Sequence, residues 1–523
     1  MTLLKTAEGA SSPRPVPRGW WSQLYAAGTD GPETQGARHG LALLLFILIL
    51  LTVFRVAALF VSPSELGFDE AQYWDWSRHF AFGYFTKPPL IAWIIGIERG
   101  LCGDTAACVR LASPLFHFGT AIALALLARR LYGPATGFWT GIFYAILPGV
   151  SLSSFLMTTD APLLFLFALA LHPLITYLER PNLTSAFVFG LVVGLGLLAK
   201  YAMIYLPVMV VLAAIALPGL RRAVFRPVSL VALLVAFLIL SPNLLWNLFN
   251  GLATFRHVGG DNIGWSLSRL NAVGGFEFLA AQFGVAGPVI FGAMLNAGLF
   301  GLRSEKPETD RLLLWLSLPL VAAITVQGFL SQANANWAAP AYGAGTVLAT
   351  ALILRDRRPI YFLANLAICG SLALALLLVT AVLDPTGAKG PARQFAQLGG
   401  WRVTAENIER LAKERGATTL VSESRALTAG LTYALRESSL AVEALLMTGE
   451  RVEDHYQADR PFQQGEPVTG HLFVGLSDAA AKSLGLVPIA EIVAPIYSNR
   501  SGVMTVYGPS GATTVSPSSK SGG

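Results

Sequence analysis

The feature that most constrains the fold is a succession of about eleven apolar stretches, each about 20 residues long. A helix of about 20 residues matches the thickness of the bilayer hydrocarbon. Only 13% of the residues are charged, whereas soluble domains carry about 25%. The sequence therefore predicts a polytopic α-helical membrane protein. The expected spans lie near residues 40–61, 107–128, 134–150, 160–178, 184–200, 201–219, 227–248, 277–300, 311–331, 337–354 and 360–381.

Basic residues are concentrated in alternate turns between these spans. Arg129-Arg130, Arg221-Arg222 and Arg355 lie in such turns, and the intervening turns are poor in Lys and Arg. Cytoplasmic turns of membrane proteins carry this excess of basic residues. The formal net charge of +6 therefore reports topology and does not indicate a nucleic-acid partner, since the basic residues form no cluster. We expect the N-terminus inside and the C-terminal segment outside.

The junction at Lys200-Tyr201 leaves two interpretations open. Almost no loop separates the spans near 184–200 and 201–219, so they could form one long bent helix or two short spans. Two spans are favoured because merging them would reverse the charge pattern of every later turn.

Hydropathy and composition divide the chain into a membrane domain, a smaller domain and two tails. Residues 1–38 and 509–523 have the Pro, Gly and Ser content of flexible tails. Residues 39–383 form the membrane domain, with a first outer loop at 62–106. Residues 384–508 have the hydropathy of a soluble domain and predict a small α/β domain.

Three segments support the prediction of an α/β domain. Residues 404–412 show amphipathic periodicity and predict a helix that opens at a Thr404 cap. Residues 418–422 and 471–475 are short apolar runs typical of buried strands.

Three carboxylates are expected at the outer face of the membrane. Asp69-Glu70 follow the first span, and Asp160 begins another. Charge near hydrocarbon is costly unless it faces a cavity or a partner, so these residues are candidates for catalysis. They could also hold a divalent cation such as Mg²⁺ or Mn²⁺. The structural alternatives are an acidic pair favoured by a helix dipole for Asp69-Glu70, and a helix cap for Asp160.

Two lysines are candidates for binding a phosphate. Lys87 precedes Pro88-Pro89, whose fixed φ angles would aim its ammonium group at a defined point. Lys200 lies at the outer junction of two spans. Either lysine could instead only reach lipid headgroups at the interface.

Aromatic residues and one arginine complete the candidates at the outer face. Tyr73, Trp74 and Tyr84 could stack on sugar rings or belong to the aromatic belt at the membrane interface. Arg256 lies in a later outer loop, where it could be solvated or contact a charged sugar or the acceptor.

The chain contains three cysteines. Cys102 and Cys108 share the first outer loop, where an oxidising compartment would permit a disulfide, although two free thiols are the alternative. Cys369 lies in the last span and is most simply a buried small apolar residue.

Five short motifs, taken in this order, resemble one family. Over about residues 40–380 the chain is similar to the bacterial membrane glycosyltransferases of the GT-C superfamily. These are related to dolichyl-phosphate-mannose protein mannosyltransferases and to the lipid A aminoarabinose transferase. The motifs are Asp-Glu-Ala-x-Tyr-Trp-x-Trp-Ser at 69–77, Gly-Tyr-Phe-x-Lys-Pro-Pro at 83–89, Thr-x-Asp-Ala-Pro-Leu at 158–163, Leu-Ala-Lys-Tyr at 198–201 and Ala-Asn-Trp-Ala-Ala-Pro-Ala-Tyr at 335–342.

The resemblance implies a reaction and a location. It implies that the membrane domain has a GT-C fold in the bacterial inner membrane. Hydropathy adds about eleven transmembrane helices, and an odd number of crossings places the small α/β domain in the periplasm. The resemblance also implies transfer of a sugar from a polyprenyl-phosphate donor to an envelope lipid, glycan or protein. That transfer would occur on the periplasmic face with inversion at the anomeric carbon.

The resemblance also implies roles for individual residues. Asp69 would be the general base that takes the proton of the acceptor hydroxyl, or a carboxylate that orients the acceptor. Asp160 is the second candidate for the base, and Glu70 would have a supporting role. Lys87 would bind the donor phosphate, with Lys200 assisting. The later motifs add three substrate-binding candidates, Tyr201, Asn336 and Trp337.

Two departures leave the sugar and the acceptor open. The spacing between Asp69 and Lys87 is shorter than in the aminoarabinose transferase, and the segment at 334–342 follows a different pattern. The chain is therefore expected to form a different branch, whose use of a metal ion is also open.

Two other classes of protein are alternatives to an enzyme. A secondary transporter predicts ionisable residues near the middle of spans and two similar halves. Here the carboxylates lie at one face and no internal repeat is visible. An envelope scaffold or receptor would leave the motif of the first outer loop unexplained.

Overall fold

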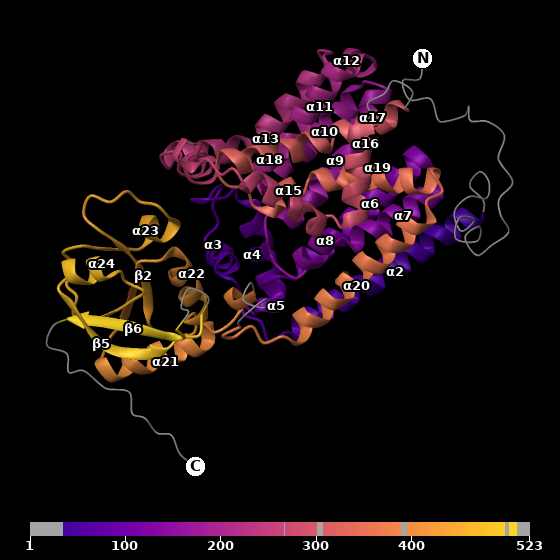
Figure 1. Ribbon diagram of the computed structural model, residues 1–523. Helices are drawn as coiled ribbons and strands as arrows, with labels where there is room; N and C mark the ends of the chain where they lie inside the picture. Colours follow the sequence, from indigo (N-terminus) through magenta and orange to yellow (C-terminus); the bar gives the residue numbers. More distant parts are fainter. Residues whose placement is uncertain (1–34, 266, 301–306, 389–394, 497–500, 510–523) are drawn as a thin grey trace, which may run out of the picture. The chain divides into compact units, whose positions relative to one another are not determined.

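The computed structural model describes residues 35–265, 267–300, 307–388, 395–496 and 501–509 (Figure 1). The chain divides into two compact units. Unit 1 comprises residues 1–60, 87–91 and 110–379, and unit 2 comprises 61–86, 92–109 and 380–523. Of the expected tails, 1–34 and 510–523 lie outside the described residues, and 35–38 begin the first helix.

Unit 1 consists of helices. Among the described residues, six helical segments are long and apolar enough to cross a bilayer, and four shorter apolar helices accompany them. They correspond to ten of the eleven expected spans, and no segment among them corresponds to 134–150. The number of crossings stays a prediction. The helices of this unit are α2 (Gln35–Val61), α6 (Ala112–Tyr132), α7 (Pro134–Ala145), α8 (Pro148–Ser153), α9 (Asp160–Glu179), α10 (Leu183–Ala199), η1 (Tyr201–Ile204), α11 (Tyr205–Ala216), α12 (Pro218–Val224), α13 (Ser229–Phe249), α14 (Ala253–Arg256), η2 (His257–Ile263), η3 (Leu267–Arg269), α15 (Gly274–Val285), α16 (Pro288–Phe300), α17 (Glu308–Trp315), α18 (Leu318–Leu330), η4 (Ala335–Ala338), α19 (Ala341–Arg355) and α20 (Pro359–Val382).

Two of the expected spans are divided between helices at a proline. The stretch 134–150 is divided between α7 and α8, and 277–300 between α15 and α16. Pro148 and Pro288 begin the second helix of each pair. Proline fits the first turn of a helix but removes a hydrogen bond from a helix interior, so the prediction of a continuous helix over these two stretches was wrong. The expected span 311–331 contains a turn between α17 and α18, but Glu308–Leu330 still forms one helical segment long and apolar enough to cross a bilayer.

The Lys200 junction separates two helices. The backbone of Lys200 is extended, with φ −161° and ψ 134°, between the end of α10 and the start of η1. The single bent helix is therefore excluded, and the preferred prediction of two segments is confirmed.

Burial differs sharply among the helices of unit 1. In the apolar window of α9, 72% of the residues are buried, compared with 11% in α13 and 17% in α20. Helix α9 therefore lies inside the bundle, whereas α13 and α20 present apolar side chains at its surface. Such surfaces are what a protein within lipid requires.

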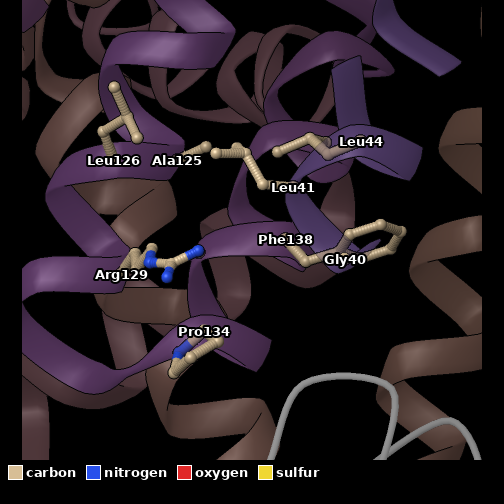
Figure 2. Close-up of a pocket in the computed structure, with 9 residues that line it drawn as sticks. Gly40, Leu41, Leu44, Ala125, Leu126, Arg129, Pro134 and Phe138 are labelled. Carbon is tan, nitrogen blue, oxygen red and sulfur yellow. The ribbon is translucent and has the colours of Figure 1, made fainter. Parts of the chain in front are cut away.

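The packing of α2 against α6 and α7 is close. Figure 2 shows Leu41 and Leu44 of α2 beside Ala125 of α6 and Phe138 of α7. Helices α6 and α7 also approach closely, because a Cβ atom added to Gly137 of α7 would lie 2.7 Å from the carbonyl oxygen of Ala125 of α6. Only glycine fits at this position. The remaining cavity of about 20 Å³ holds about one water and is too small for a substrate.

Unit 2 contains one mixed sheet with the strand order β3-β2-β1-β4-β6-β5. Strands β1 to β4 pair in parallel, whereas β6 pairs antiparallel with β4 and β5. The strands are β1 (Thr419–Ser422), β2 (Ala441–Leu446), β3 (Pro461–Gln463), β4 (His471–Val474), β5 (Leu486–Val493) and β6 (Val503–Pro509). The helices that belong to this unit wholly or in large part are α3 (Phe68–Trp76), α4 (Leu90–Cys102), α5 (Ala106–Val109), α21 (Trp401–Arg415), α22 (Arg425–Ala434), α23 (His455–Asp459) and α24 (Asp478–Ser483).

The predictions for the α/β domain are largely confirmed. The two expected strands correspond to β1 and β4, and the expected helix corresponds to α21. The predicted cap was wrong, because α21 begins at Trp401 and Thr404 lies in its first turn. The Thr404 hydroxyl donates to the carbonyl of Gly400 at 2.7 Å within the helix.

Unit 2 also contains most of the first outer loop, which the sequence analysis assigned to the membrane domain. Glu65 connects this loop to α21, since its carboxylate accepts the backbone N–H groups of Trp401 at 2.7 Å and Arg402 at 2.8 Å. Burial raises the pKa of the Glu65 carboxyl, although these two donors oppose the shift. The loop is thus anchored by the start of a helix far along the chain.

Candidate active site

Three of the predicted site residues meet in unit 1. Asp160 is the first residue of α9, Lys200 lies at the extended junction before η1, and Asn336 lies in η4. One oxygen of the Asp160 carboxylate accepts from Lys200 Nζ and the other from Asn336 Nδ2, both at 2.6 Å. The Asp160 side chain is 8% exposed and that of Lys200 is 20% exposed. The helix-cap alternative for Asp160 explains neither contact.

A cavity of about 320 Å³ lies beside this cluster. Asp160 and Asn336 line it, together with the polar side chains of Tyr144, Ser153 and Tyr342. Most of its other lining residues are apolar. Ligand sites in proteins typically have this size and this mixture of an apolar wall with a few convergent polar groups.

A buried histidine supports the wall of the cavity. His117 Nδ1 lies 3.2 Å from the hydroxyl of Tyr144, and its Nε2 lies 3.0 Å from the hydroxyl of Ser153. None of these three residues is among the site residues predicted from the sequence. The available signal was an ionisable residue within the apolar stretch 107–128, which is rare unless it serves a site.

Tyr201 is held in place by two asparagines of α13. Its hydroxyl donates to Asn243 Oδ1 at 2.6 Å and accepts from Asn247 Nδ2 at 3.2 Å. Its ring stacks on Phe255 with centroids 5.2 Å apart. Tyr201 therefore fixes the segment that follows Lys200, and the exposed Arg256 comes directly after Phe255 on α14.

Two other candidates in unit 1 keep predicted roles. Trp337 follows Asn336 in η4 and is half-buried against the apolar core. Lys87 is half-buried in the irregular segment before α4. Substrate binding by Trp337 and phosphate binding by Lys87 stay predictions.

The acidic pair of the first outer loop lies on α3 in unit 2. Glu70 is buried and accepts the backbone N–H of Gly67 at 2.9 Å, as expected of a carboxylate that caps a helix. The side chain of Asp69 is 55% exposed and pairs with Arg425 Nη1 at 3.0 Å. Arg425 also donates to Gln72, so one guanidinium holds two residues of α3.

A second ion pair joins α3 to the C-terminal segment. Arg460 Nη2 donates to the Asp75 carboxylate at 2.7 Å, and the Asp75 side chain is 4% exposed. The first outer loop therefore depends for its conformation on two arginines that come more than 350 residues later, at separations of 356 and 385 residues.

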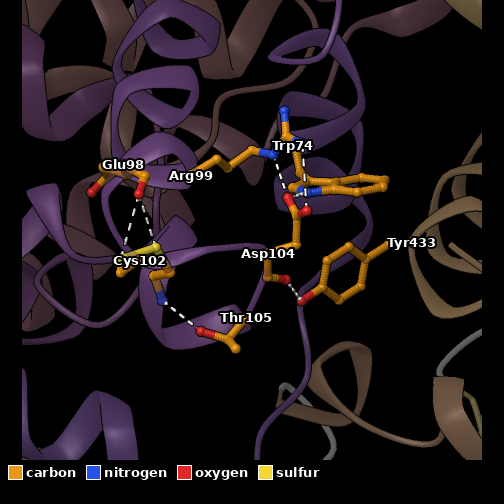
Figure 3. The surroundings of a disulfide bond; sticks show 8 residues. Trp74, Glu98, Arg99, Cys102, Asp104, Thr105 and Tyr433 are labelled. Carbon is orange, nitrogen blue, oxygen red and sulfur yellow. Dashed lines mark hydrogen bonds and ion pairs between the residues drawn. A yellow bond between two sulfur atoms is a disulfide. The ribbon is translucent and has the colours of Figure 1, made fainter. Parts of the chain in front are cut away.

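The aromatic candidates of the first outer loop are buried in unit 2. The Trp74 indole donates to Asp104 at 2.6 Å, and the Tyr433 hydroxyl donates to the Asp104 carbonyl at 2.7 Å (Figure 3). Tyr84 stacks on Trp76 with centroids 4.8 Å apart. Sugar stacking by Trp74, Tyr84 and the equally buried Tyr73 stays a prediction.

Asp104 forms the polar centre of this group. The side chains of Trp74 and Arg99 donate to the same carboxylate oxygen. The hydrogen bond from Arg99 lowers the pKa of the Asp104 carboxyl below its ordinary value, and the Trp74 indole acts in the same direction. The Asp104 carboxylate therefore stays charged to lower pH in the folded protein.

Cys102 and Cys108 form a disulfide in the structure, with their Cα atoms 5.9 Å apart (Figure 3). It connects the end of α4 to α5, directly beside Asp104. Cys369 is a buried free thiol, as the sequence indicated.

Asp69 and Glu70 lie in unit 2, and Asp160 lies in unit 1. Within the described part of each unit, no group of three or more His, Cys, Asp or Glu residues could hold a metal ion. Both oxygens of Asp160 accept hydrogen bonds from protein donors, and one oxygen of Glu70 caps α3. A divalent cation on these carboxylates therefore stays an expectation from the sequence.

Comparisons with known proteins agree with these observations. Residues 86–246 match the family model described as dolichyl-phosphate-mannose-protein mannosyltransferase. The chain is 38% identical over 441 residues to lipid A galacturonosyltransferase RgtD of Rhizobium johnstonii, covering 83% of this chain and 91% of that protein. It is 27% identical over 196 residues to lipopolysaccharide core galacturonosyltransferase RgtA of the same organism, covering 37% of this chain and 39% of that protein.

The fold also resembles that of a solved structure. The crystal structure of ArnT from Cupriavidus metallidurans bound to undecaprenyl phosphate aligns with a TM-score of 0.63. The alignment covers 90% of this chain and 98% of that chain at 16% identity. This likeness concerns the arrangement of helices and the small sheet domain.

Proposed function

The chain belongs to the GT-C family of membrane glycosyltransferases, and on that premise we propose a specific reaction for it. The enzyme transfers a uronic acid from a polyprenyl-phosphate carrier to a lipid A-type acceptor, at the outer face of the bacterial inner membrane. The similarity to a lipid A galacturonosyltransferase supports the sugar and the acceptor. The ArnT fold, with its bound undecaprenyl phosphate, supports the carrier. The basic turns support the choice of face.

The observation that carries this proposal is the Asp160 carboxylate at the wall of the 320 Å³ cavity. A carboxylate has about four lone-pair sites, so the hydrogen bonds from Lys200 and Asn336 leave acceptor capacity for hydroxyl groups of a sugar. The Lys200 ammonium balances the charge of Asp160. An anionic sugar that enters the cavity therefore meets a neutral pair and not an unpaired carboxylate.

In the proposed reaction a hydroxyl oxygen of the acceptor attacks the anomeric carbon of the donor sugar. The new bond to the acceptor oxygen forms while the bond from the anomeric carbon to the phosphate oxygen breaks, with inversion. Polyprenyl phosphate leaves with the electron pair, and the hydroxyl proton passes to a carboxylate.

We assign that proton transfer to Asp69 and sugar orientation to Asp160. More than half of the Asp69 side chain is exposed, and Arg425 fixes its position. Lys87 neutralises the phosphate that leaves. Glu70 supports the base indirectly, because it caps the helix that carries Asp69.

Reconstituted transfer tests the proposal. Purified protein in nanodiscs receives lipid A and either polyprenyl-phosphate galacturonate, the aminoarabinose analogue or a neutral hexose analogue. We expect lipid A to gain a hexuronate by mass spectrometry, with equimolar release of polyprenyl phosphate. Transfer of only the aminoarabinose or the hexose would refute the uronate assignment. Donor turnover that leaves lipid A unchanged, but modifies core oligosaccharide, would refute the acceptor.

A further inference from the structure

Unit 1 contains a second and larger cavity, with a volume of about 420 Å³. It is formed by α9, α10, α11, α13 and the segment after α12. Exposed apolar side chains such as Phe225, Leu230 and Leu233 lie along its rim, so it opens to the surface of the bundle. The other lining residues are Leu174, Tyr177, Leu178, Ala186, Phe189, Pro207, Val210, Val211, Val224, Arg226, Pro227, Ser229 and Ala232.

This cavity lies at the opposite end of α9 from the candidate active site. Asp160 is the first residue of α9, whereas Leu174, Tyr177 and Leu178 are in its last two turns. A helix of 20 residues is about 30 Å long, which matches the thickness of the bilayer hydrocarbon. The two cavities therefore open toward opposite leaflets, whichever way the chain is inserted.

The polar atoms in the wall are satisfied by one another. The Tyr177 hydroxyl lies 3.1 Å from the Ala223 carbonyl and 2.6 Å from the Ser229 hydroxyl, where either hydroxyl could be the donor. The Ser229 hydroxyl also lies 2.6 Å from the Val224 carbonyl. The wall is thus fixed by hydrogen bonds that join α9 to α12 and α13, and its remaining surface is apolar.

Positive charge is concentrated at one edge of the cavity. Arg226 is the one charged residue among the described lining residues. Arg221 and Arg222 are exposed in the last turn of α12, shortly before Arg226 in the chain. Within the described part of the chain, no carboxylate pairs with the Arg226 guanidinium.

We propose that this cavity binds one acyl chain of an anionic phospholipid, with the lipid phosphate on Arg226. An open apolar groove within the hydrocarbon is filled by lipid, and basic residues at the membrane surface select anionic headgroups. Guanidinium binds phosphate through two parallel hydrogen bonds. The polyprenyl chain of the donor is a less favourable occupant. The donor phosphate is expected at the opposite leaflet, so a bound polyprenyl chain would place no phosphate at Arg226. The proposal rests on the fold and not on the proposed sugar transfer.

Native mass spectrometry of the full-length protein tests this site. The protein is titrated with phosphatidylglycerol, or with phosphatidylcholine of the same acyl chains. We expect one phosphatidylglycerol to be retained preferentially. Arg226→Ala should weaken its binding about 10-fold, from the loss of a charge-assisted hydrogen bond. Leu233→Trp, which fills the groove, should weaken both lipids.

Arg358→Ala is the matched control, because Arg358 is exposed in the turn between α19 and α20 and does not line the cavity. It should retain phosphatidylglycerol as the unmodified protein does. Equal retention of the two lipids, or equal weakening by Arg226→Ala and Arg358→Ala, would overturn the headgroup assignment. Displacement of the bound lipid by undecaprenyl phosphate, without an effect of Arg226→Ala, would assign the groove to the donor tail.

Discussion

We expect Asp160 and Lys200 to contribute to turnover as one interacting pair. The perturbation is Asp160→Asn, Lys200→Met and the double variant, measured as kcat/KM for sugar transfer. The two side chains meet at 2.6 Å and are 8% and 20% exposed, so water screens their interaction only in part. Hydrogen bonds to charged groups contribute about 1.5–3 kcal/mol. If that interaction orients the sugar in the transition state, each single variant should lose about 10- to 150-fold in kcat/KM.

The double variant distinguishes one interacting pair from two residues that contribute independently. If Lys200 acts by holding Asp160, the double variant should lose about as much as Asp160→Asn alone, with a coupling energy of about 1.5–3 kcal/mol. Losses that multiply would show that the two residues act independently. Such a result would refute the reasoning.

A remote ion pair provides the control for folding. Asp310 of α17 pairs with Arg355 at 2.8 Å and is 3% exposed, but it does not line the cavity. Asp310→Asn should lower the melting temperature in detergent, because it removes the buried charge that pairs with Arg355 and accepts from Tyr132, and should leave kcat/KM almost unchanged. An equal loss of kcat/KM in Asp310→Asn would mean that the assay reports stability and not the site.

Four further predictions concern other parts of the chain. Asp69→Asn should reduce turnover about 10²–10⁴-fold with donor affinity retained, and normal turnover would remove Asp69 as the base. Lys87→Ala should weaken donor binding and Lys87→Arg should restore part of it, as measured by isothermal titration; unchanged binding in both would exclude the residue. Alkaline phosphatase fused after residue 400 should be active in the periplasm, whereas activity only after residue 355 would invert the topology. Because the pKa of Asp104 is lowered in the folded state, its contribution to stability is present above about pH 3.9 and is lost as the pH falls through the lower folded value. Arg99→Gln should move that loss to higher pH, monitored by tryptophan fluorescence, and an unchanged acid transition would contradict the assignment.

Local chemistry made much of unit 1 predictable. The apolar stretches located the helices, and the alternation of basic turns correctly favoured two helices at the Lys200 junction. The helix breaks before Pro148 and Pro288 were not predicted, because both stretches stay apolar on either side of the proline. Proline nevertheless interrupts the backbone hydrogen bonds of a helix. Motif similarity selected Asp160, Lys200 and Asn336 separately, and the structure adds that they are in contact.

Contacts between distant segments were not predictable. His117 is conspicuous as an ionisable residue in an apolar span, but the sequence does not indicate that the hydroxyls of Tyr144 and Ser153 lie beside it. Arg425 belongs to a domain without a recognisable motif, and nothing in its neighbourhood along the chain indicates that it pairs with Asp69. Such pairs depend on topology, which periodicity and composition do not encode.

The anchoring of the first outer loop has a consequence for biosynthesis. Glu65, Asp69 and Asp75 emerge early from the ribosome, but their partners follow 336 to 385 residues later. At a translation rate of about 5–20 residues per second, about 17–77 seconds pass between synthesis of the loop residues and synthesis of their partners. A nascent or truncated chain therefore carries Asp69 without the arginine that positions it. On the proposed role of Asp69 and the expected topology, sugar transfer begins only after the segment that contains Arg425 has been synthesised and exported.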